Sequence, residues 1–94
     1  MPCIIRWTPT ALQDLDLFLA SIAADDPERA VSVADRIDEA VHRLKDFPES
    51  APIYRSPLRR FHVPGLPVSC YYVYTSHDVV WILYVRHDHQ SPLQ

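Results

Sequence analysis

Lysine, glycine and methionine each occur once among the 94 residues, and no apolar run approaches the length of a membrane span. A transmembrane helix needs about 20 apolar residues, and the N-terminus has no basic segment followed by an apolar signal core. The single lysine and the net charge of −3 disfavour nonspecific nucleic-acid binding, because its affinity comes from neutralising phosphates. We therefore expect a cytoplasmic protein with no membrane partner and no strong direct binding to nucleic acid.

Cysteine is also scarce. Cys3 and Cys70 are isolated and lack CxxC spacing, so two buried, reduced thiols are the expected state in a reducing compartment. The five histidines show no HExxH spacing, and His87-Asp88-His89 alone is a weak metal motif. The sequence therefore predicts no metal site and no other cofactor.

Charge is divided unevenly along the chain. Residues 1–51 carry five basic and ten acidic side chains, a net of −5, whereas residues 52–94 carry four basic and two acidic side chains, a net of +2. The second half can therefore present a local basic face although the whole chain is acidic. Its four basic side chains are Arg55, Arg59, Arg60 and Arg86.

Residues 58–87 contain three runs rich in β-branched and aromatic residues, which predict a meander of antiparallel strands. The gap at 76–78 is too short for a crossover, so the last two runs should form a hairpin. Gly65 lies between Pro64 and Pro67, where we expect a turn with positive φ. Residues 3–7 predict a further strand, residues 49–57 a connecting loop and residues 88–94 a flexible tail.

Two helices are predicted before the meander. Thr8-Pro9 and Asp26-Pro27 each place a capping side chain before a proline suited to the first helical position. The first helix should end near Ala24, and the second should end by Phe47 because a proline follows. Apolar residues recur at helical spacing and predict the buried faces: Leu12, Leu15, Phe18, Leu19, Ile22 and Ala23 in the first helix, and Ala30, Val33, Ala34, Ile37, Ala40, Val41 and Leu44 in the second.

The predicted order is strand, helix, helix, strand, strand, strand in one α+β domain over residues 1–94. The helical hairpin should cover one face of a mainly antiparallel sheet. Alternation places Phe61 and Val63 in the core, and Arg60 and His62 on the open face. The last two strands are apolar on both sides, so parity does not assign their inward face and indicates that the open face is also covered.

An ordered set of short motifs extends over nearly the whole chain. The first helix opens with W-T-P-x-A-x-x-D-L, from Trp7 to Leu15. The strands carry L-R-x-F-x-V-x-G-L-P from Leu58, then V-x-I-L-x-V-x-H ending at His87. This set resembles the ParE branch of the ParE/RelE toxin superfamily.

The resemblance implies a toxin of a bacterial type II toxin–antitoxin system, which a cognate ParD- or RelB-type antitoxin neutralises in a hetero-oligomer. ParE-like members trap DNA gyrase on cleaved DNA, whereas RelE-like members are ribosome-dependent mRNA endonucleases. Because both share one fold, the fold does not choose between the two activities.

Each activity assigns roles to particular residues. A gyrase inhibitor performs no chemistry and would contact its target through Arg59, Arg60, Arg86 and His87. RNA cleavage requires a base, a cation and an acid, for which the chain offers Arg60, Arg86 and His87, with Tyr72 as a further candidate. The expected antitoxin contacts are Phe18 and Ile22 on the helices, and Tyr72 and Trp81 on the sheet.

The same residues can instead have purely structural roles. A histidine at a strand end can hydrogen-bond to the backbone, the arginines can form ion pairs with the acidic helices, and the aromatic residues can pack on the sheet. Two departures from the nuclease pattern favour the gyrase inhibitor: no arginine begins the strand after Gly65, and no basic residue follows His87. The alternatives are a RelE-like mRNA endonuclease and a non-toxic module that binds an antitoxin.

Overall fold

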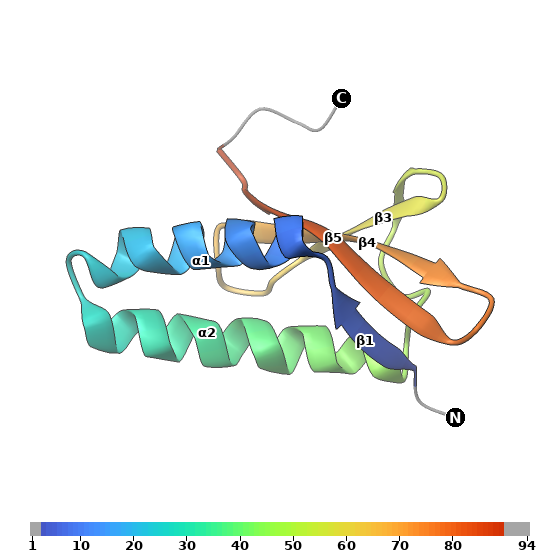
Figure 1. Ribbon diagram of the computed structural model, residues 1–94, viewed down its shortest axis with the longest axis horizontal. Coiled ribbons are helices and arrows are strands. Elements are labelled where there is room, and N and C mark those ends of the chain that lie inside the picture. The colour runs from blue at the N-terminus through green and yellow to red at the C-terminus, as the bar shows by residue number, and fades with distance from the viewer. Residues whose placement is uncertain (1–2, 90–94) are drawn as a thin grey trace.

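The computed structural model describes residues 3–89 and consists of a five-stranded sheet with a helical hairpin on one face (Figure 1). This is the α+β architecture expected from the sequence. Within the described residues, no helix is both long and apolar enough to cross a membrane. In chain order the elements are β1 Ile4–Trp7, α1 Pro9–Ala23, α2 Pro27–His42, a 3₁₀ turn Arg43–Lys45, β2 Ile53–Arg55, β3 Leu58–His62, β4 Val68–Thr75 and β5 Val79–His87.

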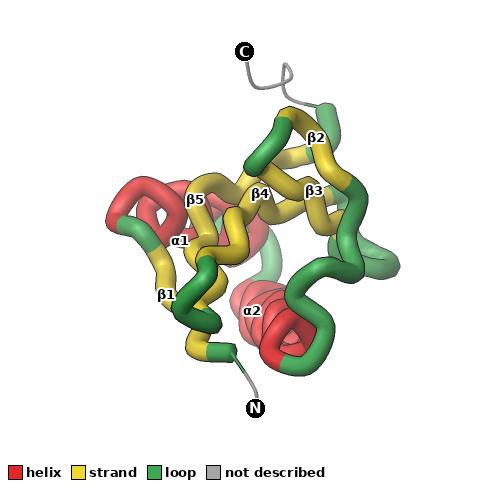
Figure 2. The backbone as a smooth tube through the Cα atoms, turned by 90° about the vertical axis from the view of Figure 1, so that its right-hand side faces the viewer, coloured by secondary structure: helices red, strands yellow, loops and turns green. Residues whose placement is uncertain are grey.

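The strands lie in the order β1-β5-β4-β3-β2. Among the strands of residues 3–89, β1 and β5 alone run parallel, and every other pair is antiparallel. Figure 2 shows β1 and β2 at opposite edges of the sheet. The short strand β2 corrects the prediction of a loop over residues 49–57: three residues enclosed by Pro52 and Pro57 are too few to produce a strand pattern, and pairing with β3 creates the strand.

Both helices begin as predicted. The Thr8 side chain accepts a hydrogen bond from the Ala11 amide, and the Asp26 carboxylate accepts one from the Arg29 amide, each at 3.1 Å. These caps satisfy amides that have no partner inside the helix. The predicted face of α2 is buried, apart from a half-buried Ala34, whereas Leu12 of α1 is 47% exposed and was wrongly assigned to the core.

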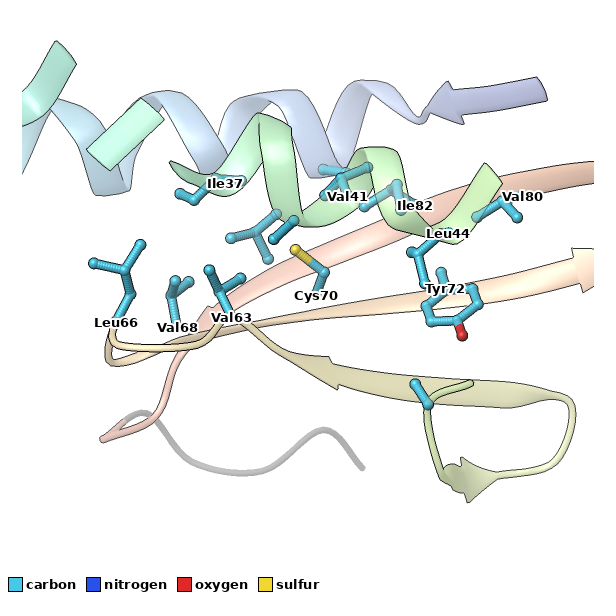
Figure 3. Close-up of a cluster of buried hydrophobic side chains, with 14 of the residues drawn as sticks. Ile37, Val41, Leu44, Val63, Leu66, Val68, Cys70, Tyr72, Val80 and Ile82 are labelled. Atoms are coloured by element: carbon cyan, nitrogen blue, oxygen red, sulfur yellow. The ribbon is translucent and has the colours of Figure 1, made fainter. Parts of the chain in front are cut away.

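The core lies between α2 and the helix-facing side of the sheet. Figure 3 shows Ile37, Val41 and Leu44 directed toward sheet residues that include Cys70 and Tyr72. Both cysteines are buried free thiols, as expected. Burial raises the pKa of Cys70 from 9.0 to about 12, so this thiol is neutral and inert at physiological pH.

A bulge in β5 decides which side chains face the helices. Tyr72 pairs with Ile82, but Tyr71 pairs with Tyr84, so Leu83 is an extra residue in the ladder. Cys70, Tyr72, Val80, Ile82 and Val85 consequently point inward. Parity alone fails here because the alternation is interrupted at Leu83.

The turn between β3 and β4 requires its glycine. Gly65 has a φ of +79°, as the sequence predicted. Arg36 of α2 fixes the same turn by donating from Nη2 to the Pro64 carbonyl at 3.3 Å, and a side chain at position 65 would collide with this guanidinium. The turn is therefore held by a backbone conformation and by a helix contact together.

Candidate functional site

The structure separates the four predicted target-binding residues. Arg60 lies on the open face, and Arg86 shares that face because it pairs with Ser69 across β4. His87 lies on the other face, where its ring centroid is 6.0 Å from that of Phe18 in α1. Arg60, Arg86 and His87 therefore do not form the single cluster that the nuclease hypothesis requires.

Arg59 also faces away from the open surface. It pairs with Tyr72 in register, and its Nη1 atom donates to the carbonyls of Ala51 at 2.7 Å and Glu49 at 3.2 Å. These bonds fix the segment before β2. Arg59 thus has a structural role, which leaves Arg60 and Arg86 as the predicted target-binding residues on the open face.

A polar cluster surrounds Arg60 on the open face. Arg60 Nη2 lies 3.5 Å from Asp88 Oδ1, and His62 Nδ1 lies 3.3 Å from Asp88 Oδ2. The Ser69 hydroxyl donates to Asp88 Oδ1 at 3.0 Å and lies 3.5 Å from His62 Nδ1. We call Arg60, His62, Ser69 and Asp88 the open-face cluster; its carboxylate offsets part of the positive charge predicted there.

Sequence reasoning placed His62 on the open face but missed Ser69 and Asp88 as site residues. Ser69 belongs to an otherwise apolar strand, and Asp88 was assigned to the flexible tail. Instead, Asp88 is anchored by its carboxylate and by its amide, which donates to the Pro67 carbonyl at 2.9 Å. Only the strand register, which pairs Ser69 with His62 on one side and with Arg86 on the other, could have placed Ser69 in this site. Residues 90–94 of the predicted tail lie outside the described residues.

A cleft of about 280 Å³ lies between α1 and the end of β5. Because β1 pairs with β5 only as far as Ile82, α1 borders the rest of this edge. Asp14 binds the edge by accepting a hydrogen bond from the Val85 amide at 3.1 Å. The cleft is lined by Asp14, Leu17, Phe18, Ser21, Val85 and His87, and we call it the α1–β5 cleft.

The four predicted antitoxin contacts differ in their location and in their exposure to solvent. Phe18 lines the α1–β5 cleft, while Ile22 is half-buried against the core. Trp81 is half-buried on the open face, in register with Arg6 and Val73. Tyr72 is fully buried, and its hydroxyl donates to the Pro48 carbonyl at 2.8 Å. This burial is incompatible with the predicted placement of Tyr72 in an exposed groove or at a nuclease site.

A second cleft, of about 350 Å³, lies between edge strand β1 and α2, where sequence reasoning identified no site. Its polar lining comes from Asp38, His42 and Lys45 of the helical segment. Among residues 3–89, no three His, Cys, Asp or Glu side chains are arranged to hold a metal ion.

Comparison with known proteins identifies the family. Residues 5–92 match the family model described as the ParE toxin of the type II toxin–antitoxin system parDE. The chain belongs to this ParE toxin family. The match extends over both candidate surfaces, the open-face cluster and the α1–β5 cleft.

Relatives of this ParE-family chain agree with the assignment. "Putative toxin Y4kP" of Sinorhizobium fredii is 40% identical over 88 residues, which cover 93% of this chain and 90% of the relative. A chain of the chromosomal ParDE system of P. aeruginosa superposes with a TM-score of 0.79 at 21% identity, covering 90% of this chain and 95% of its own. A chain of the RelBE2 toxin–antitoxin complex of Mycobacterium tuberculosis superposes with a TM-score of 0.61 at 23% identity. The match covers 93% of this chain and 99% of the RelBE2 chain. At these identities the two structures establish the shared fold.

Proposed function

We propose that this ParE-family chain inhibits DNA gyrase by protein–protein contact and is neutralised by a ParD-type antitoxin. The position of His87 is the observation that favours a non-catalytic activity. It packs beside Phe18 of α1, on the face of the sheet opposite Arg60 and Arg86. An acid or base must come within hydrogen-bond reach of the reacting group, so His87 does not complete a nuclease site with these arginines.

Charge on the open face supports the same proposal. The carboxylate of Asp88 lies 3.5 Å from the Arg60 guanidinium and reduces its attraction for an RNA backbone. A cleavage site instead needs uncompensated cations for the charge that develops on the phosphate. A paired arginine beside an imidazole better suits the polar rim of a protein interface.

The α1–β5 cleft is the proposed antitoxin site. Leu17 is 65% exposed beside Phe18, and an amphipathic helix of a partner could bury both in the groove. Asp14, Ser21 and His87 line the same cleft and offer polar contacts. The two toxin–antitoxin systems to which the neighbouring structures belong support an antitoxin partner.

The proposed target is tested with a gyrase supercoiling and cleavage assay on purified, antitoxin-free protein. We expect linear DNA to accumulate and the effect to disappear when the antitoxin is added. The Leu17→Asp variant should still act on gyrase but resist neutralisation, with Val31→Asp as a control because Val31 is similarly exposed on α2 (64%). Unaffected gyrase in the presence of folded protein would reject the proposal.

One contact favours an mRNA endonuclease as the second candidate. His62 Nδ1 lies 3.3 Å from Asp88, so a carboxylate orients an imidazole on the same face as Arg60. The corresponding experiment is a ribosome cleavage assay in which His62→Ala and His87→Ala are compared. Codon-phased cleavage lost only in His62→Ala would support this candidate. Intact transcripts and active gyrase would leave a non-toxic antitoxin-binding module.

A further inference from the structure

The open-face cluster has the arrangement of an anion-binding site. Three polar groups from two neighbouring strands converge on one carboxylate: Arg60 Nη2 and His62 Nδ1 from β3, and the Ser69 hydroxyl from β4. The His62 ring joins the other two as a donor when Nδ1 carries a proton. Ser69 is 1% exposed and forms the floor, whereas Arg60 and His62 are 44% and 55% exposed at the rim. The floor is thus shielded from solvent, and the rim is accessible to a ligand.

The number of donors does not match the number of acceptor atoms in Asp88. With Nδ1 of His62 protonated, the two Asp88 oxygens serve three donors, because Oδ1 is shared between Ser69 and Arg60 while Oδ2 faces His62. The shared oxygen lies 3.0 Å from Ser69 but 3.5 Å from Arg60, and the second distance exceeds that of a good charge-assisted hydrogen bond. A tetrahedral oxyanion with three free oxygens would give each donor its own acceptor.

We propose that Arg60, His62 and Ser69 form a phosphate-binding site and that Asp88 occupies it in the free protein. Arg86, which pairs with Ser69 in register, adds positive charge on the same face. Binding of a phosphate group requires the Asp88 side chain to move aside. The site is thereby closed by a carboxylate of the chain itself.

The position of Asp88 permits this displacement. It directly follows β5 and its side chain is 25% exposed, and exposed ion pairs contribute little net stability in water. Its amide remains bonded to the Pro67 carbonyl, so the side chain can move while the backbone stays in place. Phosphate binding does not depend on the target; only a link between this site and toxicity would rest on the proposed function.

The experiment measures inorganic phosphate binding to the full chain by NMR, with chloride holding the ionic strength constant. Asp88→Ala should bind phosphate at least about tenfold more tightly than the unmodified chain, because it removes an intramolecular competitor present at high effective concentration. Shifts should centre on Arg60, His62 and Ser69. Asp35→Ala is the matched control: it makes the same change in net charge on α2, on the other side of the sheet.

The double variant Asp88→Ala with Arg60→Gln should lose the added affinity while keeping the thermal melt of the single variant. Equal phosphate affinity in Asp88→Ala and Asp35→Ala would overturn the proposal, since the gain would then be a net-charge effect. Acetate binding as tight as phosphate would overturn the assignment to phosphate. The gyrase assay is separate, so phosphate binding without gyrase inhibition would reject the proposed function alone, and the reverse would reject this inference alone.

Discussion

On the sheet face that α1 and α2 cover, Cys70, Tyr72 and Ile82 have no exposed surface, whereas Arg60 and His62 on the open face keep 44% and 55% of their side chains exposed. The covered face is a packed apolar layer, and the open face carries paired charges at its rim. The covered face should therefore supply most of the stability of the fold, so residues of the open face can change with little loss of stability. Three perturbations test this contrast.

Truncation of Tyr72 should have the largest effect. Tyr72→Ala removes a fully buried ring and should lower the free energy of unfolding by about 3–5 kcal/mol, as measured by urea denaturation. Tyr72→Phe keeps the ring and loses only the hydrogen bond to the Pro48 carbonyl, so its loss should be about 1 kcal/mol. Equal losses in the two variants would show that the hydroxyl, rather than packing, holds this face.

Alkaline pH should weaken the same face through Cys70. Its pKa is raised from 9.0 to about 12 by burial, so between these values the unfolded chain releases a proton that the folded chain retains. This contribution is fully present below pH 9 and is lost as pH rises toward 12, with a slope approaching about 1.4 kcal/mol per pH unit. Denaturation from pH 8.5 to 10 measures it, and Cys70→Ala should remove the slope due to this thiol.

The smallest effect is expected on the open face. Arg60→Gln breaks an exposed ion pair with Asp88 and should change the free energy of unfolding by less than about 1 kcal/mol. The difference should shrink further in 1 M salt because exposed charges are screened. A loss as large as that of Tyr72→Ala would contradict the division of roles between the two faces.

Sequence reasoning succeeded where a signal lies within a few residues. Capping at Thr8 and Asp26, the stripe of α2 and the turn at Gly65 are all local, and the structure confirms them. The motif set identified the family. The helix caps, the apolar face of α2 and the turn at Gly65 together determine most of the fold.

The candidate site was less predictable because it depends on pairing between distant segments. Asp88 meets Ser69 across 19 residues of sequence, and only strand register reveals that contact. Tyr72 and Trp81 occupy strands that are apolar on both sides, so neither composition nor alternation indicated which one was buried. By contrast, alternation correctly predicted that the neighbouring residues Arg59 and Arg60 lie on opposite faces.

The extra residue at Leu83 determines which ionisable group reaches the open surface at the end of β5. With strict alternation continued from Ile82, Arg86 would turn inward and His87 outward. That arrangement would require a guanidinium to give up water inside an apolar layer, which is costly without a compensating partner. The bulge thus keeps the Arg86 guanidinium out of the apolar layer, and it places the His87 imidazole on the opposite face from Arg60 and His62.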